Sequence, residues 1–384
     1  MNCESSSDDS GTVTPYRIVD NDVIVIKIGS NSLLAADGKN IDEDYMKKIA
    51  DQVSVLMKDH GKKVVLVSSG ACAVGVQTMG MSQKPDSIEE CQALSAIGQI
   101  HVITKWERAF APHKLLCSQL MLTHHDFNIR SSCKNLIATL RVLFEWGIVP
   151  IVNENDPIAT SELTVGDNDR LAALLSSQVA AKHLLLLTDI NGLYDADPRF
   201  NPEAQKLDVI EAVTKTMLNA AGGPGAKGRG GMRSKLESAR FAAACGVCAI
   251  IAHSREEQVV LRTILDDNSN IGTKILPVPW DQPADDAVNE RRRWIACKRT
   301  TGVVTVDKAG EDHFMARGDI NTDHIVDHEG TFGVGDTVEV RDASGHEIGR
   351  ALSSIESTRM KDGTGCVALS SEDYFILECP SRCK

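Results

Sequence analysis

Several features are missing from this sequence, and each absence narrows what the protein does. No apolar run in the 384 residues approaches the roughly 18 that a membrane-spanning helix needs, so we expect no membrane segment. The first residues, MNCESSSDDSGTVTP, have neither the apolar core of an export signal nor the Arg-rich, acid-poor character of an organelle transit peptide. We therefore expect a cytoplasmic protein with a disordered tail over residues 1–18.

A surplus of positive charge is also absent. The chain has 41 Lys and Arg residues against 53 Asp and Glu residues, which gives a formal net charge of −12. Because nucleic-acid affinity depends largely on neutralising phosphates, this balance argues against a general polyanion binder. A local basic site is still compatible with it.

Neither a metal site nor a disulfide framework is indicated by the 11 cysteines, which we expect to be reduced thiols in a protein without an export signal. Cys245 and Cys248 form a CxxC pair, but no second pair completes a zinc site, and their apolar neighbours favour two buried thiols. The phosphate-binding pattern GxxxxGK followed by Ser or Thr is missing too, which excludes a P-loop.

The length favours two domains, and the first of them reads as an α/β fold. Short runs of consecutive apolar residues alternate with amphipathic segments, as expected for an open, mostly parallel sheet sandwiched by helices. The predicted strands are Val23–Ile28, Val64–Ser68, Leu115–Leu122, Ile148–Asn153, Leu184–Thr188 and Val247–Ala252. The predicted helices are Ile41–Met57, Asn135–Trp146, Leu171–Ala181 and Met232–Cys245.

Small or hydrogen-bonding residues follow four of the predicted strands. Ligands of such sheets bind at the carboxyl ends of the strands, so four polar endings in one domain indicate a shared cleft. The endings are Lys27–Ser32, Ser68–Ala71, Asn153–Asp156 and Thr188–Asp189.

The stretch Ile151–Asp169 carries the densest group of these polar residues. It opens as an apolar strand, turns polar at Asn153, and has a second polar group, Gly166–Asp169, before the next helix. Burying such acids and amides unpaired would cost on the order of several kcal/mol each, which favours a cleft for a small, charged ligand. An acidic loop with a helix cap is the alternative.

Two lysines stand where a structural role does not explain them. Lys27 lies between two isoleucines and precedes Gly29, so a ligand-facing role is favoured over a snorkelling surface position. Lys235 follows the Gly-rich run 222–231 into the first turn of a helix, where a positive charge opposes the helix dipole. An anion held by the glycine amides and by Lys235 would explain both features, and a flexible surface loop is the alternative.

Six segments of the chain occur in an order and spacing that match one known family. They are VIKIGSNSLL, VVLVSSGACAVG, VPIVNENDPIAT, VGDNDRLAALLS, LLLLTDINGLYDADPR and GRGGMRSKLESARFA, between about Val23 and Thr273. This combination resembles the glutamate 5-kinases of the amino-acid kinase family. The resemblance implies the amino-acid kinase fold, with transfer of the ATP γ-phosphoryl group to the side-chain carboxylate of L-glutamate. The product would be L-glutamyl 5-phosphate, which begins proline synthesis.

The resemblance also implies roles for individual residues. Lys27 and Lys235 are similar to the two catalytic lysines of the family, and Asp169 resembles the acid that orients them. The residues that resemble the glutamate-binding set are Ser69, Asp156 and Asn168, with Asp156 suited to the substrate ammonium group. The residues that resemble the nucleotide site are Lys27, Gly29, Thr188, Asp189, Arg229, Gly230, Gly231, Met232, Arg233, Ser234 and Lys235.

The same resemblance implies Mg²⁺ alongside ATP, although no protein ligand to a metal is assigned. It also leads us to expect feedback inhibition by proline and a homo-oligomer, either a dimer or a tetramer. Bacterial relatives tend to have TGGMSTK where this chain has RGGMRSK over residues 229–235. The added charge of Arg229 and Arg233 would either strengthen nucleotide contacts or face solvent.

The composition changes after Pro277. A Pro- and Asp-containing run over 278–290 indicates a linker, and β-rich segments separated by Gly- and Asp-containing turns follow it. With RRRWI at its start, this last part resembles a PUA domain. The predicted domains are therefore a kinase domain over 19–277, the linker, and a PUA-like domain over 291–384. The predicted strands of the last domain are Gly302–Asp307, Thr337–Arg341, Glu347–Leu352 and Gly365–Leu369.

RNA binding by the PUA-like domain is not favoured. Residues 291–384 contain 13 Lys and Arg residues against 16 Asp and Glu residues, with no basic stripe interleaved with aromatics. A domain that modulates the kinase or its assembly is the preferred interpretation.

Two alternatives for the whole chain stay open. One is another amino-acid kinase activity, on N-acetylglutamate, aspartate or UMP. The other is a degenerate kinase that acts as a sensor or binds RNA, although the presence of Lys27, Asp169 and Lys235 argues against it.

Overall fold

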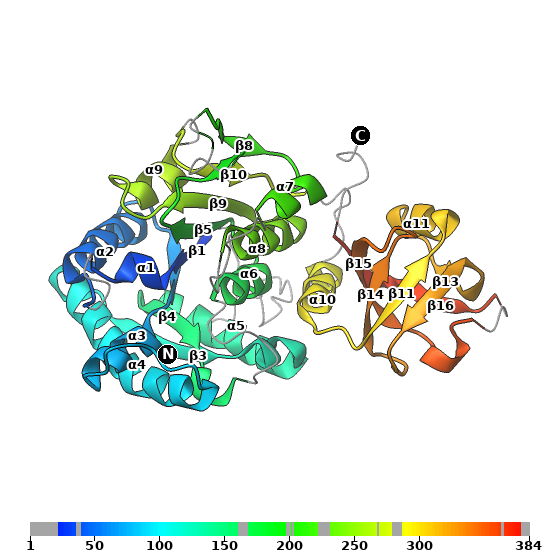
Figure 1. The fold of residues 1–384 in the computed structure, drawn as a ribbon, viewed down its shortest axis with the longest axis horizontal. Helices are drawn as coiled ribbons and strands as arrows, with labels where there is room; N and C mark the ends of the chain where they lie inside the picture. Colours follow the sequence, from blue (N-terminus) through cyan, green and yellow to red (C-terminus); the bar gives the residue numbers. More distant parts are fainter. Residues whose placement is uncertain are drawn as a thin grey trace, which may run out of the picture.

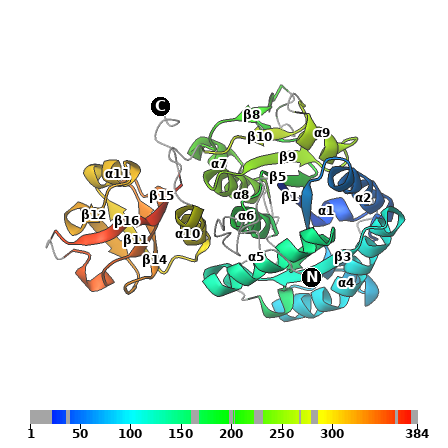
Figure 2. The same ribbon diagram turned by 180° about the vertical axis from the view of Figure 1, so that it is seen from behind.

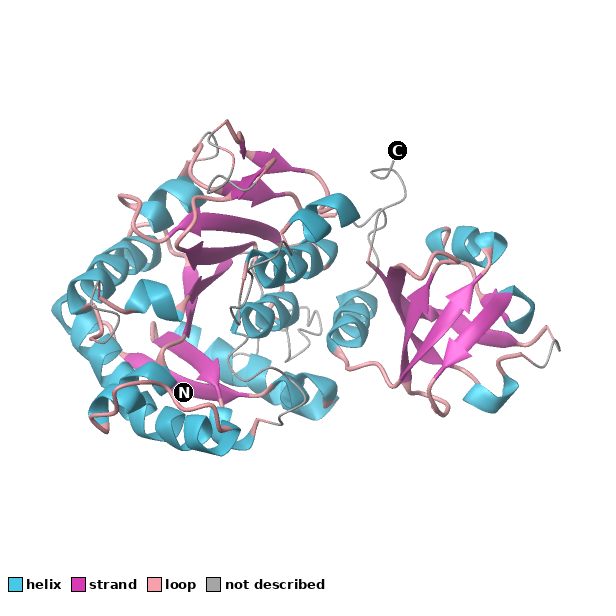
Figure 3. Ribbon diagram, viewed as in Figure 1, coloured by secondary structure: helices cyan, strands magenta, loops and turns pink. Residues whose placement is uncertain are grey.

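The computed structural model describes residues 22–377 except 36–39, 160–167, 197–200, 202, 222–230, 267–268, 279–285 and 362–364. Two bodies lie side by side, and each is built on its own β-sheet (Figures 1 and 3). Helix α10 lies between them in both views (Figures 1 and 2). The predicted disordered tail over residues 1–18 falls outside the described residues.

An eight-stranded sheet with the order β3-β4-β2-β1-β5-β9-β10-β8 forms the centre of the larger body. From β3 to β9 in this order the strands are parallel, whereas β10 runs antiparallel to β9 and parallel to β8. The predicted open, mostly parallel sheet is thus confirmed. The strands are β1 Val23–Ile28, β2 Lys63–Ser68, β3 Cys117–Leu122, β4 Val149–Glu154, β5 His183–Thr188, β8 Val209–Ile210, β9 Cys248–His253 and β10 Thr273–Ile275. A separate hairpin pairs β6 Leu193–Tyr194 with β7 Lys206–Leu207.

Helices cover both faces of this sheet, as the strand–helix alternation predicts (Figure 1). They are α1 Ser30–Leu33, α2 Glu43–Lys58, α3 Ala71–Thr78, α4 Ile88–Phe110, α5 Arg130–Glu145, α6 Asn168–Gln178, α7 Lys215–Ala220, α8 Met232–Ala244 and α9 Val259–Leu265. Single 3₁₀ turns lie at Ala111–His113, His124–Asn128 and Asp156–Ile158.

Strand β1 divides its side chains between two hydrophobic cores, because successive strand residues point to opposite faces of a sheet. The core formed with α2, α4 and α9 takes its isoleucines at 24, 26 and 28. The core formed with α5, α6 and α8 takes Val23 and Val25. Lys27 has the same parity as these two valines, so it lies on the face that carries α6 and α8.

Helix α2 follows from local sequence alone. The side chain of Asp42 caps it by accepting a hydrogen bond from the Tyr45 backbone N–H at 2.9 Å. Glu43 and Asp44 lie in the first turn and Lys58 in the last, which complements the helix dipole. Its bounds agree with the predicted helix to within two residues.

The α3–α4 pair depends instead on close backbone contact. A Cβ atom on Gly98 would lie 1.9 Å from the carbonyl oxygen of Ala71, and one on Gly75 would lie 2.0 Å from that of Leu94. Only glycine allows this approach at either position. Neither helix is among the predicted ones, because glycine adds no apolar signal to the pattern that reveals a helix.

The smaller body is a six-stranded sheet with the order β12-β16-β15-β14-β11-β13 and a core of its own. Its strands are β11 Gly302–Val306, β12 Ile320–Asn321, β13 Ile325–Glu329, β14 Thr337–Arg341, β15 Glu347–Ser353 and β16 Val367–Ile376. Helix α11 Lys308–Met315 and 3₁₀ turns at Thr322–His324 and Ser357–Arg359 complete it. Strand β16 extends seven residues beyond the predicted end at Leu369, since pairing with β15 carries it through the polar segment 370–373.

Helix α10, Asp286–Cys297, packs against both bodies. Ile295 and Ala296 belong to the same core cluster as Leu352 and Phe375 of the smaller body and as α6 and α8 of the larger one. Residues 286–290 of α10 coincide with the second part of the predicted linker, whose residues 279–285 lie outside the described ones. The domain boundaries stay predictions.

Two expected absences can be examined on the described residues. None of the helices in this part of the chain is both long and apolar enough to cross a membrane. None of the eight cysteines within it forms a disulfide, and Cys245 is buried while Cys248 is half-buried. These two lie between the end of α8 and the start of β9, at the helix-to-strand junction expected from the sequence.

We expect Gly98→Ala to lower the free energy of unfolding by about 3 kcal/mol, because the new methyl group forces α3 and α4 apart. Urea denaturation of the full chain measures the loss. Ala93→Ser adds one atom at an exposed position of the same helix and should change stability by less than about 0.5 kcal/mol. Equal stability of the two variants would show that the helix contact is not tight.

Candidate active site

Lys27 occupies the centre of the large sheet. It lies beside Val67 of β2 and Leu186 of β5, and only 6% of its surface is exposed. Its Nζ atom is 2.6 Å from Oδ1 of Asp169 in the first turn of α6. A buried ammonium group needs such a partner, because its desolvation is otherwise uncompensated.

The same carboxylate holds a second lysine. Lys235, in the first turn of α8, places its Nζ atom 2.9 Å from Oδ2 of Asp169. The side chains of Asp169 and Lys235 are 1% and 9% exposed. One carboxylate therefore faces two ammonium groups, and the buried cluster carries one positive charge in excess. Such a cluster attracts an anion.

The two lysines also set the ionisation of Asp169. Burial alone would raise the pKa of this carboxyl group, but the charges of Lys27 and Lys235 outweigh burial and hold the pKa below its ordinary value. Asp169 is therefore ionised throughout the neutral range and fixes both lysines. The structure brings together the three residues that the sequence singles out as catalytic.

Asn168 connects this cluster with neighbouring strand ends. Its Nδ2 group donates hydrogen bonds to Oγ of Ser69 at 2.9 Å and to Oδ1 of Asn153 at 3.0 Å. Asn153 in turn donates to Oε1 of Gln99 at 2.6 Å. Ser69 and Asn168, two of the three predicted glutamate-binding residues, are thus in direct contact.

The third residue of that set, Asp156, lies at a cavity of about 180 Å³. Gln99 and Ala71 line the same cavity. The hydrogen bonds from Asn168 to Asn153 and from Asn153 to Gln99 therefore connect the lysine cluster with this cavity. Asp156 is 8% exposed, and its Oδ1 atom has no hydrogen-bond partner among the described residues. Burial raises its pKa, while Ser95 and Lys84 act in the opposite direction. A buried carboxylate of this kind suits an incoming cationic group.

Sequence reasoning missed two members of this network. Gln99 comes from α4, and Asn153 lies in a predicted polar strand ending without an assigned role. Ser95 and Gln99 lie four residues apart on one face of α4 and are both buried, but only the structure shows this burial. The indole N–H of Trp106, further along this helix, donates to Oγ of Ser68 at 3.0 Å.

The predicted nucleotide residues divide into two places. Thr188 is buried at the end of β5, next to the strand of Lys27, and donates to Oδ1 of the exposed Asp189 at 3.0 Å. A Cβ atom on Gly29 would lie 3.6 Å from the Lys27 ammonium, so this glycine also borders the cluster. Gly231 is the residue before α8, and Met232 begins that helix.

Arg233 and Ser234 face elsewhere, toward a cavity beside the smaller body, although they adjoin Lys235. Arg233 is exposed and pairs with Glu237 at 2.9 Å along the helix. This favours a solvent-facing position for the Arg233 charge over a contact with the nucleotide. Arg229 and Gly230 lie outside the described residues, as does Asp167.

No group of three or more His, Cys, Asp or Glu side chains in the described ranges is arranged to hold a metal ion. Both oxygens of Asp169 face lysines. Magnesium commonly binds through substrate phosphates, retained waters and one or two carboxylates, so a dedicated cluster is not required for a magnesium–nucleotide substrate.

Comparison with known proteins identifies relatives of both bodies. The model of the Amino acid kinase family matches residues 22–253, and that of the PUA domain matches residues 302–375. The glutamate 5-kinase of Caldanaerobacter subterraneus subsp. tengcongensis is 36% identical over 346 residues, covering 89% of this chain and 90% of its own. That of Pseudomonas syringae pv. syringae is 39% identical over 337 residues, covering 87% and 88%. An isopentenyl phosphate kinase structure covers 66% of this chain and 99% of its own, with 18% identity and a TM-score of 0.48.

The family matches assign the two bodies separately, the larger to the amino acid kinases and the smaller to the PUA domains. Because these relatives are similar over most of both chains, the chain belongs to the glutamate 5-kinase family. The resemblance found in the sequence is thereby confirmed.

We expect Asp169→Asn to lower the free energy of unfolding by about 3 kcal/mol, since two buried ammonium groups lose their shared counter-charge. Denaturant unfolding of the full chain measures this. Asp208→Asn is the matched control, because Asp208 is 60% exposed and pairs with Lys206 at 2.7 Å. Its loss should stay below about 1 kcal/mol. Similar losses in both variants would contradict a charge-bridging role for Asp169.

Proposed function

We propose that this chain transfers the γ-phosphoryl group of ATP to the side-chain carboxylate of L-glutamate and releases L-glutamyl 5-phosphate. The carrying observation is the buried Lys27–Asp169–Lys235 cluster in a member of the glutamate 5-kinase family. Lys27 comes from the strand and Lys235 from the helix, so the ammonium groups reach one point from two directions.

The chemistry suits these residues. A glutamate side chain is already ionised at pH 7, so the attacking carboxylate needs no general base. The obstacle is the approach of two anions and the charge that develops on the transferring phosphoryl group. Lys27 and Lys235 offset that charge, and Asp169 holds them in place before the substrates arrive.

Asp156 and Asn168 supply the acceptor side of the proposal. The Oδ1 atoms of both are buried acceptors without a hydrogen-bond partner among the described residues. An α-ammonium group provides three N–H donors and a positive charge, which matches a carboxylate and an amide oxygen. Ser69 holds the Asn168 amide in the orientation that leaves its oxygen available.

The donor side uses the neighbouring strand ends. Thr188 and Asp189 close β5, and Gly29 lies where a phosphate could approach the Lys27 ammonium closely. The remaining nucleotide contacts would come from residues 229–232 and Lys235, since Arg233 and Ser234 line the other cavity. Magnesium would enter as the magnesium–ATP substrate, held mainly by the phosphates.

An assay of acceptor specificity tests the proposal. The full chain is incubated with magnesium–ATP, hydroxylamine and L-glutamate, so that an acyl phosphate is trapped as the hydroxamate. We expect hydroxamate from glutamate and much less from aspartate or N-acetylglutamate. If only another acceptor gave product, that acceptor would be the substrate and glutamate would not. If no acceptor gave product, a degenerate kinase would be favoured.

Lysine variants test the cluster in the same assay. Lys27→Ala and Lys235→Ala should each lower kcat about 10²- to 10³-fold, by analogy with removal of an oxyanion donor. Lys47→Ala is the control, because this lysine is 57% exposed and pairs with Asp44 at 3.0 Å. It should keep full activity. Near-normal turnover in either cluster variant that remains folded would remove that lysine from the mechanism.

The raised pKa of Asp156 predicts a pH dependence of glutamate binding. Below this raised pKa, which lies above 3.8, the free protein carries a neutral Asp156 that cannot pair with the ammonium group. The KM for glutamate should therefore rise as the pH falls through it. Asp156→Asn should raise KM about 10- to 100-fold at neutral pH and abolish that part of the pH dependence.

Asp59→Asn is the control for this measurement, because Asp59 is exposed at the end of α2 and is not among the residues that line the cavity. The side-chain carboxyl group of the glutamate substrate also titrates, with a pKa of about 4.3. This titration is the same for every variant, so it does not affect the comparison between them. A pH profile of KM that is unchanged in Asp156→Asn would exclude Asp156 as the ammonium partner.

Three finer parts of the proposal rest on the family resemblance. Proline, which shares the ammonium and α-carboxylate groups of glutamate, would compete at Asp156 and raise the glutamate KM in the same titration.

The chain would form a homo-oligomer, which light scattering of the purified protein measures. It would act in the cytoplasm, which localisation of a tagged full chain tests.

A further inference from the structure

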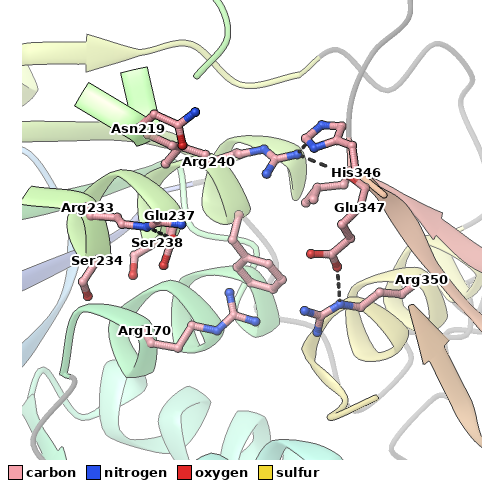
Figure 4. Close-up of a pocket in the computed structure, with 13 residues that line it drawn as sticks. Arg170, Asn219, Arg233, Ser234, Glu237, Ser238, Arg240, His346, Glu347 and Arg350 are labelled. Atoms are coloured by element: carbon pink, nitrogen blue, oxygen red, sulfur yellow. Dashed lines mark hydrogen bonds and ion pairs between the residues drawn. The ribbon is translucent and has the colours of Figure 1, made fainter. Parts of the chain in front are cut away.

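A second cavity, of about 510 Å³, lies between the two bodies (Figure 4). The larger body contributes residues of α6 and α8, and the smaller contributes residues of β15 and the segment before it. Its volume is in the range of small-molecule sites, about 300–1,000 Å³. None of the predicted catalytic or glutamate-binding residues lines it, although Arg233 and Ser234 do.

Positive charge is concentrated in this cavity, in a chain whose net charge is −12. Four arginines line it, against two glutamates. Each glutamate already pairs with one of these arginines at 2.9 Å, Glu237 with Arg233 and Glu347 with Arg350. Among the lining residues, arginines therefore outnumber glutamates by two, and His346 lines the cavity as well.

Arg170 and Arg350 bring like charges together from opposite sides. Figure 4 shows their guanidinium groups pointing into the same space. Arg170 lies over the ring of Phe241 at 4.1 Å, which fixes its orientation. Burial lowers the pKa of Arg170, and the charge of Arg350 lowers it further. An anion between two such groups would relieve their repulsion.

The cavity also has the geometry of an oxyanion site. Guanidinium groups offer planar, paired donors that match phosphate and carboxylate oxygens. Arg240 already reaches across the gap, with Nη2 at 3.4 Å from both Nε2 of His346 and the carbonyl oxygen of Glu347. The hydroxyls of Ser234 and Ser238 line the same space.

We propose that this cavity is a second binding site, for a small phosphate-bearing anion held jointly by Arg170 and Arg240 of the larger body and by Arg350 of the smaller one. The volume exceeds what a single phosphate group fills, so the natural ligand carries further atoms. The site is separate from the phosphoryl-transfer cluster and stands whether or not glutamate is the acceptor.

The position of the site links it to that cluster. Arg170 directly follows Asp169 in α6, and Ser234 directly precedes Lys235 in α8. Arg350 also donates from Nη1 to the carbonyl oxygens of Ala296 and Lys298 at the end of α10, both at 2.9 Å. An anion held here would draw the first turns of α6 and α8 toward the smaller body, and its binding would be coupled to substrate binding.

Inorganic pyrophosphate is the probe that tests this site. Because pyrophosphate could also bind the lysine cluster, it is titrated calorimetrically into Lys27→Ala, at constant ionic strength set by chloride. We expect one equivalent to bind. Adding Arg240→Gln should weaken binding about tenfold or more, since a charge-assisted contact is lost. Arg170→Gln should weaken binding to a similar extent. If this variant does not fold, the Arg240→Gln variant alone decides the test.

Arg262→Gln is the matched control, because Arg262 is an exposed arginine of α9. Combined with Lys27→Ala, it should bind pyrophosphate with unchanged affinity. No binding to Lys27→Ala would mean that the anion occupies only the phosphoryl-transfer cluster, and would overturn the proposal. Equal affinity with and without Arg240→Gln would overturn it as well.

Discussion

The ion pairs that Asp169 makes with Lys27 and Lys235 are the constraint on which the site depends. Each lysine is buried, so each requires a counter-charge, and one carboxylate serves both. The arrangement leaves one positive charge in excess at the centre of the sheet. This excess charge is costly in the protein alone, and the phosphoryl group of the proposed reaction would offset it.

Two features of the fold position the lysine cluster and the hydrogen-bond network beside it. The alternation of β1 sends its isoleucines into one core and leaves Lys27 on the face of α6 and α8. The first turns of those two helices then place Asp169 and Lys235 against it. On the other side, glycine contacts between α3 and α4 let α4 approach closely enough for Gln99 to reach Asn153. Ala71 of α3 and Gln99 of α4 both line the cavity at Asp156.

The smaller body is not a passive attachment. Helix α10 shares a core with both bodies, and Arg350 fastens the end of α10 to β15. The arginine-lined cavity lies at this junction, next in sequence to Asp169 and Lys235. Arg170 and Ser234, from the first turns of α6 and α8, line this cavity. The low positive charge of residues 291–384 agrees with such an internal role better than with RNA binding.

Local sequence determined much of this protein. The buried strands, helix α2 and the unusual positions of Lys27 and Lys235 could be predicted, because apolar periodicity and misplaced charges are visible within a few residues, whereas Asp169 was assigned by its resemblance to the family. Gln99, the α3–α4 contact and the cavity between the bodies could not. They depend on which surfaces meet after folding, and a polar residue or a glycine carries no local mark of its distant partner. Likewise, only the structure shows that Arg233 and Ser234 point away from Lys235. Their direction depends on the turn of α8 and on the smaller body that packs beside this helix.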